Sequence, residues 1–367
     1  MPSESEKKEI LVICPYPVGV AAGQRLKYEQ YISDWELAGY HVDVSPFMNM
    51  SMWRIVHKNG NILRKFGWTL WGISRRLLEL IKLRNYDLVF IFMYVIPVGN
   101  HLFEWAYRLA SKRIVYDLED NRFIGADNET KGLAQILRGT GKTKFLVRTS
   151  DHVITSSPAL NDICLGINEK HRCTYITSSI DTDRFIPNNR YSNEEKVRIG
   201  WTGTFSTRPF LDLLRPVFIE LKKQRDFKLI VIGNFEYDFP EMDLEVIQWS
   251  AENEVEDLQK LDIGVYPLPM DDWVMGKSGL KAIQYMSFGL PCVATDISTV
   301  QQFIVDDENG CLVDNNDEWV TKLVELIDDP TLRQKIGKNA RNTVLQRFSK
   351  NVIGKEYLTV LESTIGK

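Results

Sequence analysis

The sequence predicts two α/β domains, each built on a doubly wound and mostly parallel sheet. Two observations support this fold class. Short apolar runs alternate with helical patterns through the first half of the chain, and the same alternation restarts after the polar stretch 191–196. A chain of 367 residues is long enough for two such domains. Because ligands bind beyond the carboxyl ends of parallel strands, two doubly wound domains predict a deep cleft between them.

The first domain is predicted over residues 1–190. Its expected strands are short apolar runs, many of them ended by proline, glycine or charged residues: 9–14, 41–45, 86–92, 113–117 and 151–156. Residues 24–37 have helical spacing of their apolar side chains, and Gly39 follows as a stop signal. These elements alternate as a βαβ pattern requires.

The second domain is predicted over residues 191–348. Its expected strands are 197–202, 227–233, 244–249, 263–267, 292–295 and 310–313. Helices are expected at 210–223, 318–327 and 332–347. The last segment, 349–367, is expected to form a helix that packs back towards the first domain.

Composition restricts the class of protein. The chain is 44% hydrophobic and 26% charged, which is ordinary for a globular protein. It has no run of 18 apolar residues, so no transmembrane helix is expected. The polar N-terminus predicts no signal peptide. The five cysteines have no Cys-x-x-Cys spacing, and free thiols of this kind favour a cytoplasmic location.

The stretch 273–291 is the most informative part of the sequence. A turn of Gly276, Lys277, Ser278 and Gly279 leads directly into a helical pattern that starts near Leu280. Free amides and the positive end of the macrodipole make such a helix start a phosphate-binding element. The helix then presents Lys281 one turn above Lys277, with Gln284 near the same face. We expect a diphosphate clamp; the alternative is a surface lysine pair.

This stretch, together with the Gly-Leu-Pro-Cys-Val-Ala that follows, resembles the donor-binding motif of retaining family 4 glycosyltransferases with the GT-B fold. The resemblance implies two Rossmann-like domains and a nucleotide-diphospho-sugar donor. Members usually carry two glutamates eight residues apart, and this sequence has Gly276 and Gln284 at those positions. The departure leaves open how sugar and ribose hydroxyls are held.

Residues in three further stretches resemble donor contacts of that family. Gly203 and Thr204 match its other donor loop, in which Arg208 would face the leaving diphosphate. Trp249 ends the strand beside which the family binds the nucleotide base, although a core tryptophan fits the pattern nearly as well. Ser278, Gly279 and Leu280 would supply amides to the donor phosphates.

The first domain offers a small-residue loop and an acidic loop. Gly19 and Gly23 flank a loop whose amides could approach a phosphate or sugar, and Arg25 follows it. The acidic loop comes directly after a predicted strand. We expect its polar side chains to touch sugar or acceptor hydroxyls, with helix capping as the alternative. The loop residues are Asp117, Glu119, Asp120 and Asn121. Glu119 and Asp120 match a His and an Asp of the family and are candidate catalytic residues.

No metal and no other cofactor is expected. Asp181 and Asp183 imitate an Asp-x-Asp metal motif, but they lie at the predicted domain boundary, where capping is the better interpretation. The histidines show no ligand spacing.

Charge is unevenly distributed along the chain. Residues 1–185 hold 24 basic and 20 acidic residues, whereas residues 186–367 hold 21 and 29. The segment 51–85 has eight basic residues, interleaved tryptophans and a single acid, Glu79. This pattern suits an anionic membrane surface, less well nucleic acid, and otherwise a solvated helix with an apolar core face. We expect membrane contact and no nucleic acid.

These observations together predict a retaining, metal-independent glycosyltransferase. It would move a sugar from a nucleotide-diphospho-sugar to a hydroxyl of a glycan or lipid-linked acceptor, in cell-surface polysaccharide or glycolipid synthesis. It would be cytoplasmic and peripheral at the cytoplasmic face of the membrane. The alternative is a non-catalytic binding subunit of a polysaccharide assembly complex, because both usual acids are missing from the donor motif.

Overall fold

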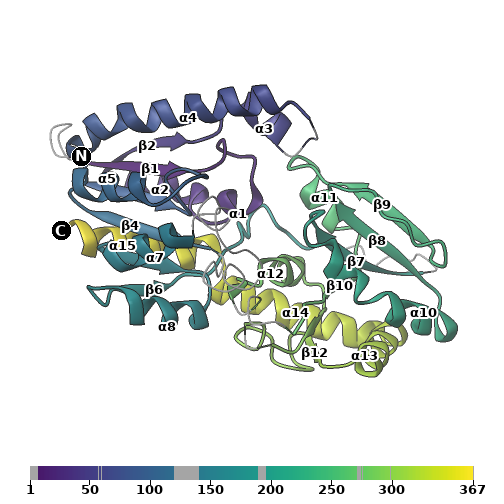
Figure 1. Ribbon diagram of the computed structural model, residues 1–367. Coiled ribbons are helices and arrows are strands. Elements are labelled where there is room, and N and C mark those ends of the chain that lie inside the picture. Colours follow the sequence, from purple (N-terminus) through teal and green to yellow (C-terminus); the bar gives the residue numbers. More distant parts are fainter. Residues whose placement is uncertain are drawn as a thin grey trace. The chain divides into compact units, whose positions relative to one another are not determined.

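The computed structural model describes residues 7–56, 58, 60–119, 140–188, 196–270, 274, 276–297 and 299–366. The chain divides into two compact units (Figure 1). Unit 1 comprises residues 1–178, 275–278 and 353–367, and unit 2 comprises residues 179–274 and 279–352. The first crossing between them therefore follows Ser178, and the C-terminal residues belong with unit 1.

Unit 1 contains a parallel sheet of six strands in the order β2-β1-β3-β4-β5-β6. The strands are β1 (Lys8–Cys14), β2 (Tyr40–Pro46), β3 (Leu88–Phe92), β4 (Ile114–Leu118), β5 (His152–Thr155) and β6 (Cys173–Tyr175). Strand β6 is not among the strands expected from the sequence. All three of its residues are only half-buried, so its apolar signal is weak.

Helices cover both faces of this sheet. One core packs the 3₁₀ turn η2 (Glu29–Tyr31), α2 (Ile32–Leu37) and α15 (Lys350–Ile365) on one side, and the short helix α1 (Ala22–Arg25) precedes η2. The other core includes residues of α3 (Met50–Val56), α4 (Ile62–Lys82), the 3₁₀ turn η3 (Leu83–Asn85), α5 (Leu102–Ala110), α7 (Thr140–Thr149) and α8 (Pro158–Ile167). Figure 1 shows α4 as a long helix beside β2.

The region expected as one helix over 24–37 is broken in the structure. A single helical turn, α1, is followed by η2 and then by α2. The break lets the side chain of Lys27 point into unit 1, where it pairs with Asp117. Tertiary contacts therefore override the continuous helical period of this segment.

Unit 2 contains a second parallel sheet of six strands, in the order β12-β11-β10-β7-β8-β9. The strands are β7 (Val197–Gly203), β8 (Phe227–Gly233), β9 (Leu244–Gln248), β10 (Ile263–Tyr266), β11 (Cys292–Thr295) and β12 (Cys311–Val313). The helices are α9 (Arg208–Asp212), α10 (Arg215–Gln224), α11 (Glu254–Leu258), α12 (Leu280–Ser287), α13 (Asn316–Asp328) and α14 (Pro330–Arg347).

The helix expected over 210–223 is also two helices, α9 and α10. Pro216 lies in the first turn of α10, where its missing N–H needs no partner. Proline at this position starts a new helix and cannot continue the old one. None of the helices in the described part of the chain is both long enough and apolar enough to cross a membrane.

Candidate functional site

The candidate site lies where the strand order of the second sheet reverses. Strand β7 has β8 on one side and β10 on the other, and the chain winds outward from β7 in both directions. In doubly wound sheets this switch point leaves a crevice at the carboxyl ends of the strands. The loop after β7 begins at Gly203, and the segment after β10 leads to α12. Both predicted donor elements therefore start from this edge of the sheet.

Lys281 joins these two elements within unit 2. Its ammonium donates to the hydroxyl of Thr207 across 3.1 Å and lies 4.7 Å from the ring centre of Trp201. The same Thr207 hydroxyl accepts from the amide of Thr204 across 3.0 Å. A Cβ on Gly203 would collide with the Trp201 ring, so the loop after β7 requires glycine there. The predicted donor residues Gly203, Thr204 and Lys281 thus lie together.

Gly279 sets the start of α12. It has φ +71°, and a Cβ at this position would come within 2.5 Å of the Phe303 ring. Both the backbone conformation and the packing therefore require glycine. Leu280 follows as the first helical residue, half-buried against the core of unit 2. The first amides of α12 have no partner within the helix, as at any helix start.

Lys277 and Ser278 are grouped with unit 1, although they directly precede α12 in the chain. The carbonyl of Gly276 accepts from the hydroxyl of Ser156 across 3.0 Å, and the carbonyl of Ser278 from that of Thr177 across 3.4 Å. Side chains of unit 1 therefore hold the turn that was expected to clamp a diphosphate. Lys277 itself is half-buried.

Tyr285 explains why an aromatic residue follows Gln284 in the motif. Its ring packs against Gly264 of β10, where a Cβ would overlap it, and its hydroxyl accepts from the amide of Thr202 across 2.7 Å. Burial raises the pKa of this phenol strongly, so it stays a neutral hydrogen-bonding group. Tyr285 thereby anchors α12 to both strands at the switch point.

The sequence led us to expect that the side chain of Gln284 is open to sugar hydroxyls, but it lies inside unit 2. It is 5% exposed, and its amide nitrogen lies 3.2 Å from a carboxylate oxygen of Glu254. Glu254 is 3% exposed and begins α11. Sequence reasoning missed Glu254. The signal was the acid-rich stretch 252–257, which contains four acids, but nothing in the sequence connects it to Gln284.

Arg208 starts α9 and is well exposed, as a phosphate contact needs to be. Its guanidinium lies 3.6 Å from the carboxylate of Asp212 and over the ring of Tyr237 at 5.8 Å. The side chain of Arg215 shares both partners, since it lies 2.8 Å from Asp212 and 4.9 Å from the Tyr237 ring. Arg208 is thus held at the surface by weak contacts that a stronger anion can replace.

Trp249 follows directly after β9, next to the end of β8. Its amide donates to the carbonyl of Gly233 across 2.9 Å, and its side chain is half-buried against the core of unit 2. The structure therefore shows the packing that a core tryptophan requires. The exposed part of the ring remains the expected base contact.

In unit 1, the small-residue loop and the acidic loop meet. A Cβ on Gly23 would lie 2.5 Å from a carboxylate oxygen of Glu119, so the carboxylate occupies the space that glycine leaves. The carbonyl of Glu119 accepts a hydrogen bond from Ser156. The structure thus brings together two residues that the sequence singled out separately. Asp120 and Asn121 lie outside the described residues.

Glu29 organises the loop around Gly19 and was not expected from the sequence. Its carboxylate accepts from the amide of Gly19 across 2.9 Å and from the side chain of Gln24. Burial raises the pKa of the Glu29 carboxyl, and these two hydrogen bonds together with the charge of Arg25 oppose the rise. Arg25 therefore lies near an acid of its own domain, at the end of α1.

Asp117 differs from its expected role as a cleft carboxylate. Its side chain is completely buried, forms an ion pair with Lys27, and accepts from the hydroxyl of Tyr357 in α15 across 3.0 Å. Burial raises the pKa of this carboxyl and the Lys27 ammonium opposes the rise. A carboxylate enclosed in this way has no side open to an acceptor, so Asp117 is a structural residue that ties the C-terminal helix to the first sheet.

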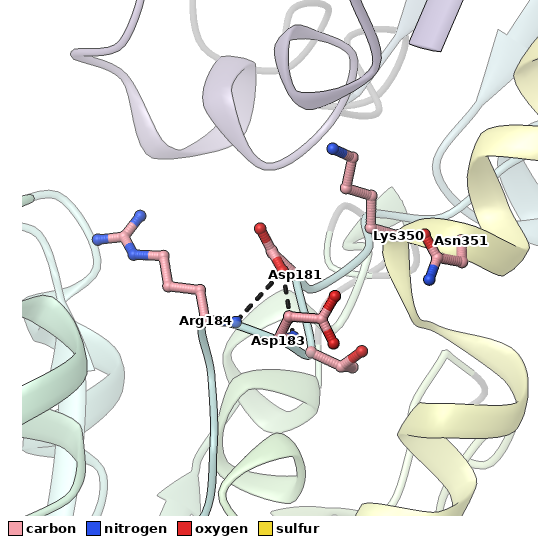
Figure 2. Close-up of a pocket in the computed structure, with 6 residues that line it drawn as sticks. Asp181, Asp183, Arg184, Lys350 and Asn351 are labelled. Carbon is pink, nitrogen blue, oxygen red and sulfur yellow. Dashed lines mark hydrogen bonds between the residues drawn. The ribbon is translucent and has the colours of Figure 1, made fainter. Parts of the chain in front are cut away.

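A cavity of about 330 Å³ lies in unit 2 beside the Asp181-Thr182-Asp183 sequence (Figure 2). It is lined by these residues and by Arg184, Lys350 and Asn351. The Asp181 carboxylate accepts from the amides of Asp183 and Arg184 at 3.1 and 3.3 Å. Asp181 therefore caps a turn, and no helix begins beside it in the described part of the chain.

Elsewhere, in the parts of the chain that the structure describes, Glu9, His41 and Asp43 place ligand atoms within 4.8 Å of one another. His41 lies 2.7 Å from Glu9, and the hydroxyl of Tyr86 donates to Asp43 across 2.7 Å. Glu9 lies on β1, and His41 and Asp43 lie on β2. They are largely exposed and pair with groups of the protein itself, so they remain a surface cluster.

The comparisons with known proteins agree with this geometry. Residues 196–329 match the family model described as Glycosyl transferases group 1. This match covers most of unit 2, including the loop after β7, Glu254 and α12. Over these residues unit 2 is therefore similar to the domain that this family model describes.

Two curated relatives illustrate the likeness in sequence. N-acetyl-alpha-D-glucosaminyl L-malate synthase of Bacillus anthracis is 25% identical over 243 residues, which is 59% of this chain and 61% of the relative. The capsular polysaccharide biosynthesis glycosyltransferase CapM of Staphylococcus aureus is 23% identical over 234 residues, 59% of this chain and 60% of the relative. The aligned part thus spans about three fifths of the length of these relatives.

Solved structures show the fold over nearly the whole chain. Sucrose-phosphate synthase from Thermosynechococcus elongatus has a TM-score of 0.69 at 14% identity, covering 97% of this chain and 99% of that one. Anabaena HepE in complex with UDP-glucose has a TM-score of 0.66 at 13% identity, with coverage of 97% and 99%. The chain has the GT-B fold, as expected from the sequence.

Proposed function

We propose that this protein is a retaining glycosyltransferase that moves a sugar from a nucleotide-diphospho-sugar to a hydroxyl of a glycan or lipid-linked acceptor. One observation supports this proposal above the others. Within the residues that match the Glycosyl transferases group 1 model, Lys281, the Thr204–Thr207 turn and the start of α12 converge at the switch point of the second sheet. A helix start with adjacent cations suits a diphosphate.

The positive groups of this region carry the proposed chemistry. As the bond to the sugar breaks, negative charge grows on the leaving diphosphate, and preorganised cations and amides stabilise it. We assign this role to Lys277, Arg208, Lys281 and the amides of residues 278–280. Because these cations supply the neutralising charge, the proposal needs no metal, and full activity in the presence of a strong chelator is the expected result.

Glu254 and Gln284 form the proposed polar contact beneath the ribose or sugar hydroxyls, which they would reach through the small part of each residue that stays exposed, 3% and 5%. The family motif usually has an acid at the position of Gln284. Here the carboxylate comes from α11, and the amide of Gln284 donates to it. A carboxylate can accept hydrogen bonds from two vicinal hydroxyls, and a hydrogen-bonded amide holds it in place for that purpose.

We further propose that Glu119, with the neighbouring Asp120 and Asn121, approaches the acceptor in unit 1 from the loop beside Gly23. The proposed pathway is the synthesis of cell-surface polysaccharide or glycolipid. Support comes from the CapM relative, whose name places it in capsular polysaccharide biosynthesis. A lipid-linked acceptor would place the protein peripherally at the cytoplasmic face of the membrane.

A donor panel tests the proposal. The purified chain is incubated with UDP-, GDP-, dTDP- and ADP-sugars, and release of the nucleoside diphosphate is measured with and without glycan acceptors. We expect one donor to be consumed and the new glycoside to keep the anomeric configuration of the donor, read by NMR. An inverted product would refute the retaining mechanism.

The second candidate function is a non-catalytic binding subunit, and the missing acids at Gly276 and Gln284 favour it. Such a subunit would bind a nucleotide-sugar or a glycan without turning the donor over. The same panel separates the two: a thermal shift with one nucleotide-sugar but no diphosphate release over a long incubation would support the binding subunit.

A further inference from the structure

The long helix α4 has its apolar side chains on the outside. Leu63, near the start of α4, is 87% exposed, and Ile81, near its end, is 80% exposed. Apart from one adjacent pair, Leu77 and Leu78, the exposed side chains recur at steps of three, four and seven residues, which places them on one face of the helix. They are Leu63, Phe66, Leu70, Leu77, Leu78 and Ile81.

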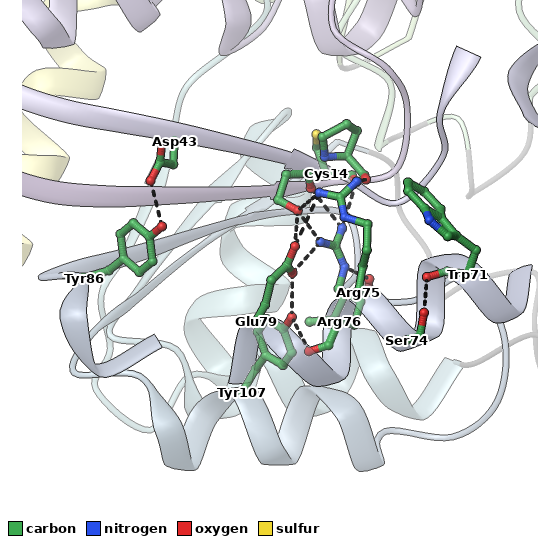
Figure 3. A network of polar contacts seen from close by, with 12 residues as sticks. Cys14, Asp43, Trp71, Ser74, Arg75, Arg76, Glu79, Tyr86 and Tyr107 are labelled. Atoms are coloured by element: carbon green, nitrogen blue, oxygen red, sulfur yellow. Dashed lines mark hydrogen bonds and ion pairs between the residues drawn. The ribbon is translucent and has the colours of Figure 1, made fainter. Parts of the chain in front are cut away.

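Two charged side chains of α4, Arg76 and Glu79, point inward instead (Figure 3). Arg76 is completely buried and donates to the carbonyls of Val95 and Ser45, both at 2.9 Å. It also lies 2.7 Å from the carboxylate of Glu79, which accepts from the hydroxyl of Tyr107 across 2.9 Å. Rotating α4 to hide its apolar face would break these charge-assisted bonds in a buried site. The network therefore fixes the apolar face outward.

The neighbouring helix α5 repeats this arrangement. Leu102, Trp105 and Leu109 are 61%, 51% and 62% exposed, whereas Glu104 and Tyr107 are buried. The Tyr107 hydroxyl donates to the carbonyl of Arg76 across 3.0 Å, so the two helices touch. Both cover the same face of the first sheet, and their outward sides therefore point away from it in the same general direction. We call these exposed apolar residues of α4 and α5 the α4–α5 face.

Charge selects the partner of the α4–α5 face. Helices α4 and α5 carry two acids, Glu79 and Glu104, and both point inward, whereas Arg64 and Lys82 of α4 are exposed. The side chain of Arg75 lies over the ring of Trp71 at 5.1 Å, at the edge of the apolar stripe. A second copy of the chain would bring cations against cations. An anionic bilayer accepts both features, because its headgroups attract the cations and its acyl region receives the apolar side chains.

We propose that the α4–α5 face inserts into the interface of an anionic lipid bilayer, with α4 lying along the membrane plane. This inference builds on the proposed function, since the α4–α5 face would bring unit 1 to a lipid-linked acceptor. The observations that support membrane insertion, however, are the contacts of α4 and α5 alone. It also differs from a purely electrostatic contact. The apolar side chains enter the bilayer, and Arg75 and Arg76 act mainly inside the protein.

Vesicle co-sedimentation tests the proposal. The purified protein is mixed with vesicles of phosphatidylcholine alone or with phosphatidylglycerol added, at low and high salt. We expect binding to the anionic vesicles that salt weakens but does not abolish. The paired substitutions Leu70→Gln and Leu77→Gln should weaken it about tenfold or more, because each removes an inserted apolar side chain. The reversals Arg64→Glu and Lys82→Glu should weaken it about 25-fold or more.

Matched controls keep the result specific. Leu37→Gln removes an 87% exposed leucine of α2, on the side of the sheet opposite α4, and should leave binding unchanged. The reversals Lys335→Glu and Lys338→Glu change two exposed cations of α14 in unit 2 and should have little effect. Circular dichroism confirms that each variant is folded.

Three outcomes would overturn the proposal: a wild-type protein that ignores anionic vesicles at low salt, binding that survives the leucine substitutions, or a dimer in size-exclusion chromatography that the same substitutions convert to a monomer. Transfer to a water-soluble acceptor is assayed in parallel. A leucine variant that loses vesicle binding but keeps this transfer supports the docking surface. Absence of transfer in every variant would count against the proposed function alone.

Discussion

The amide of Gln284 donates to the carboxylate of Glu254 inside unit 2, across 3.2 Å. The two residues are 30 positions apart in the chain and come from different helices, α12 and α11. At Gln284 the motif lacks its usual acid, and this contact places a carboxylate beside that position. The pair therefore gives the proposed donor site a polar group that the motif alone does not contain.

Substitution of Gln284 by glutamate should make donor binding depend on pH. Two carboxylates at this distance cannot both ionise at low cost, so the pKa of one rises. We expect Gln284→Glu to bind the donor weakly at alkaline pH and better as pH falls, when one protonated carboxyl again donates to the other. Calorimetry of donor binding measures the effect. Equal affinity in the wild type, Gln284→Glu and Glu254→Gln would show that the pair is only structural.

Removal of the Lys277 side chain should slow transfer more than it weakens folding. The loss of one group that stabilises charge in the transition state typically lowers kcat by about 10²–10³. Lys277→Ala is compared with Lys338→Ala, an exposed lysine on α14, under saturating donor. Near-normal turnover in Lys277→Ala would remove this residue from the proposed site.

The buried pair of Lys27 and Asp117 should show strong coupling in a double-mutant cycle. Replacing Lys27 by methionine leaves an unpaired buried carboxylate and should cost about 3–5 kcal/mol of unfolding free energy. Adding Asp117→Asn removes that charge and should recover much of the loss. Urea unfolding followed by a probe in unit 1 gives the values, and additive single effects would contradict the pairing.

Arg76 should be far more important for stability than the exposed arginine on the same helix. Its substitution by methionine leaves Glu79 without its closest cation and several backbone carbonyls without donors. We expect a loss of about 3 kcal/mol or more for Arg76→Met and within about 0.5 kcal/mol for Arg64→Ala. Hydrogen exchange of α4 provides a local measurement. Similar protection in both variants would refute the buried network.

His152 should resist protonation in the folded protein. Burial, followed by the nearby charge of Arg172, lowers the pKa of His152 from 6.5 to about 4. The unfolded chain takes up this proton as pH falls below about 6.5, whereas the native chain does not until about pH 4. The free energy of unfolding should therefore drop by about 3 kcal/mol as pH falls from 6.5 to 4. Below pH 4 His152 should cause no further loss.

The prediction for His152 is checked by NMR titration of its ring, assigned through the loss of the signal in His152→Gln. Glutamine can keep the hydrogen bond to Thr174, which lies 2.8 Å from the imidazole. The variant should lose less stability than the wild type between pH 6.5 and 4. An imidazole that titrates near 6.5 in the folded protein would contradict the effect of burial.

Local sequence patterns determined the architecture of this protein. Apolar runs such as 9–14 and 227–233 predict buried parallel strands because both faces of such a strand are covered. The Gly-Lys-Ser-Gly turn ahead of a helical pattern likewise marked the start of α12, since glycine and helix periodicity are local signals. The break at Lys27 was not predictable in this way, because it depends on a partner 90 residues further along the chain.

Tertiary structure alone decided which polar side chains are inside. Asp117 was predicted to contact sugar or acceptor hydroxyls, and Arg76 was counted in the basic segment 51–85. Each is instead buried with partners distant in sequence: Lys27 and Tyr357 for the first, Ser45 and Val95 for the second. The basic segment 51–85 was compatible with an inward or an outward apolar face, because helical periodicity defines a stripe but not its direction. The long-range hydrogen bonds of Arg76 turn that stripe outward, and these bonds exist only once the chain has folded.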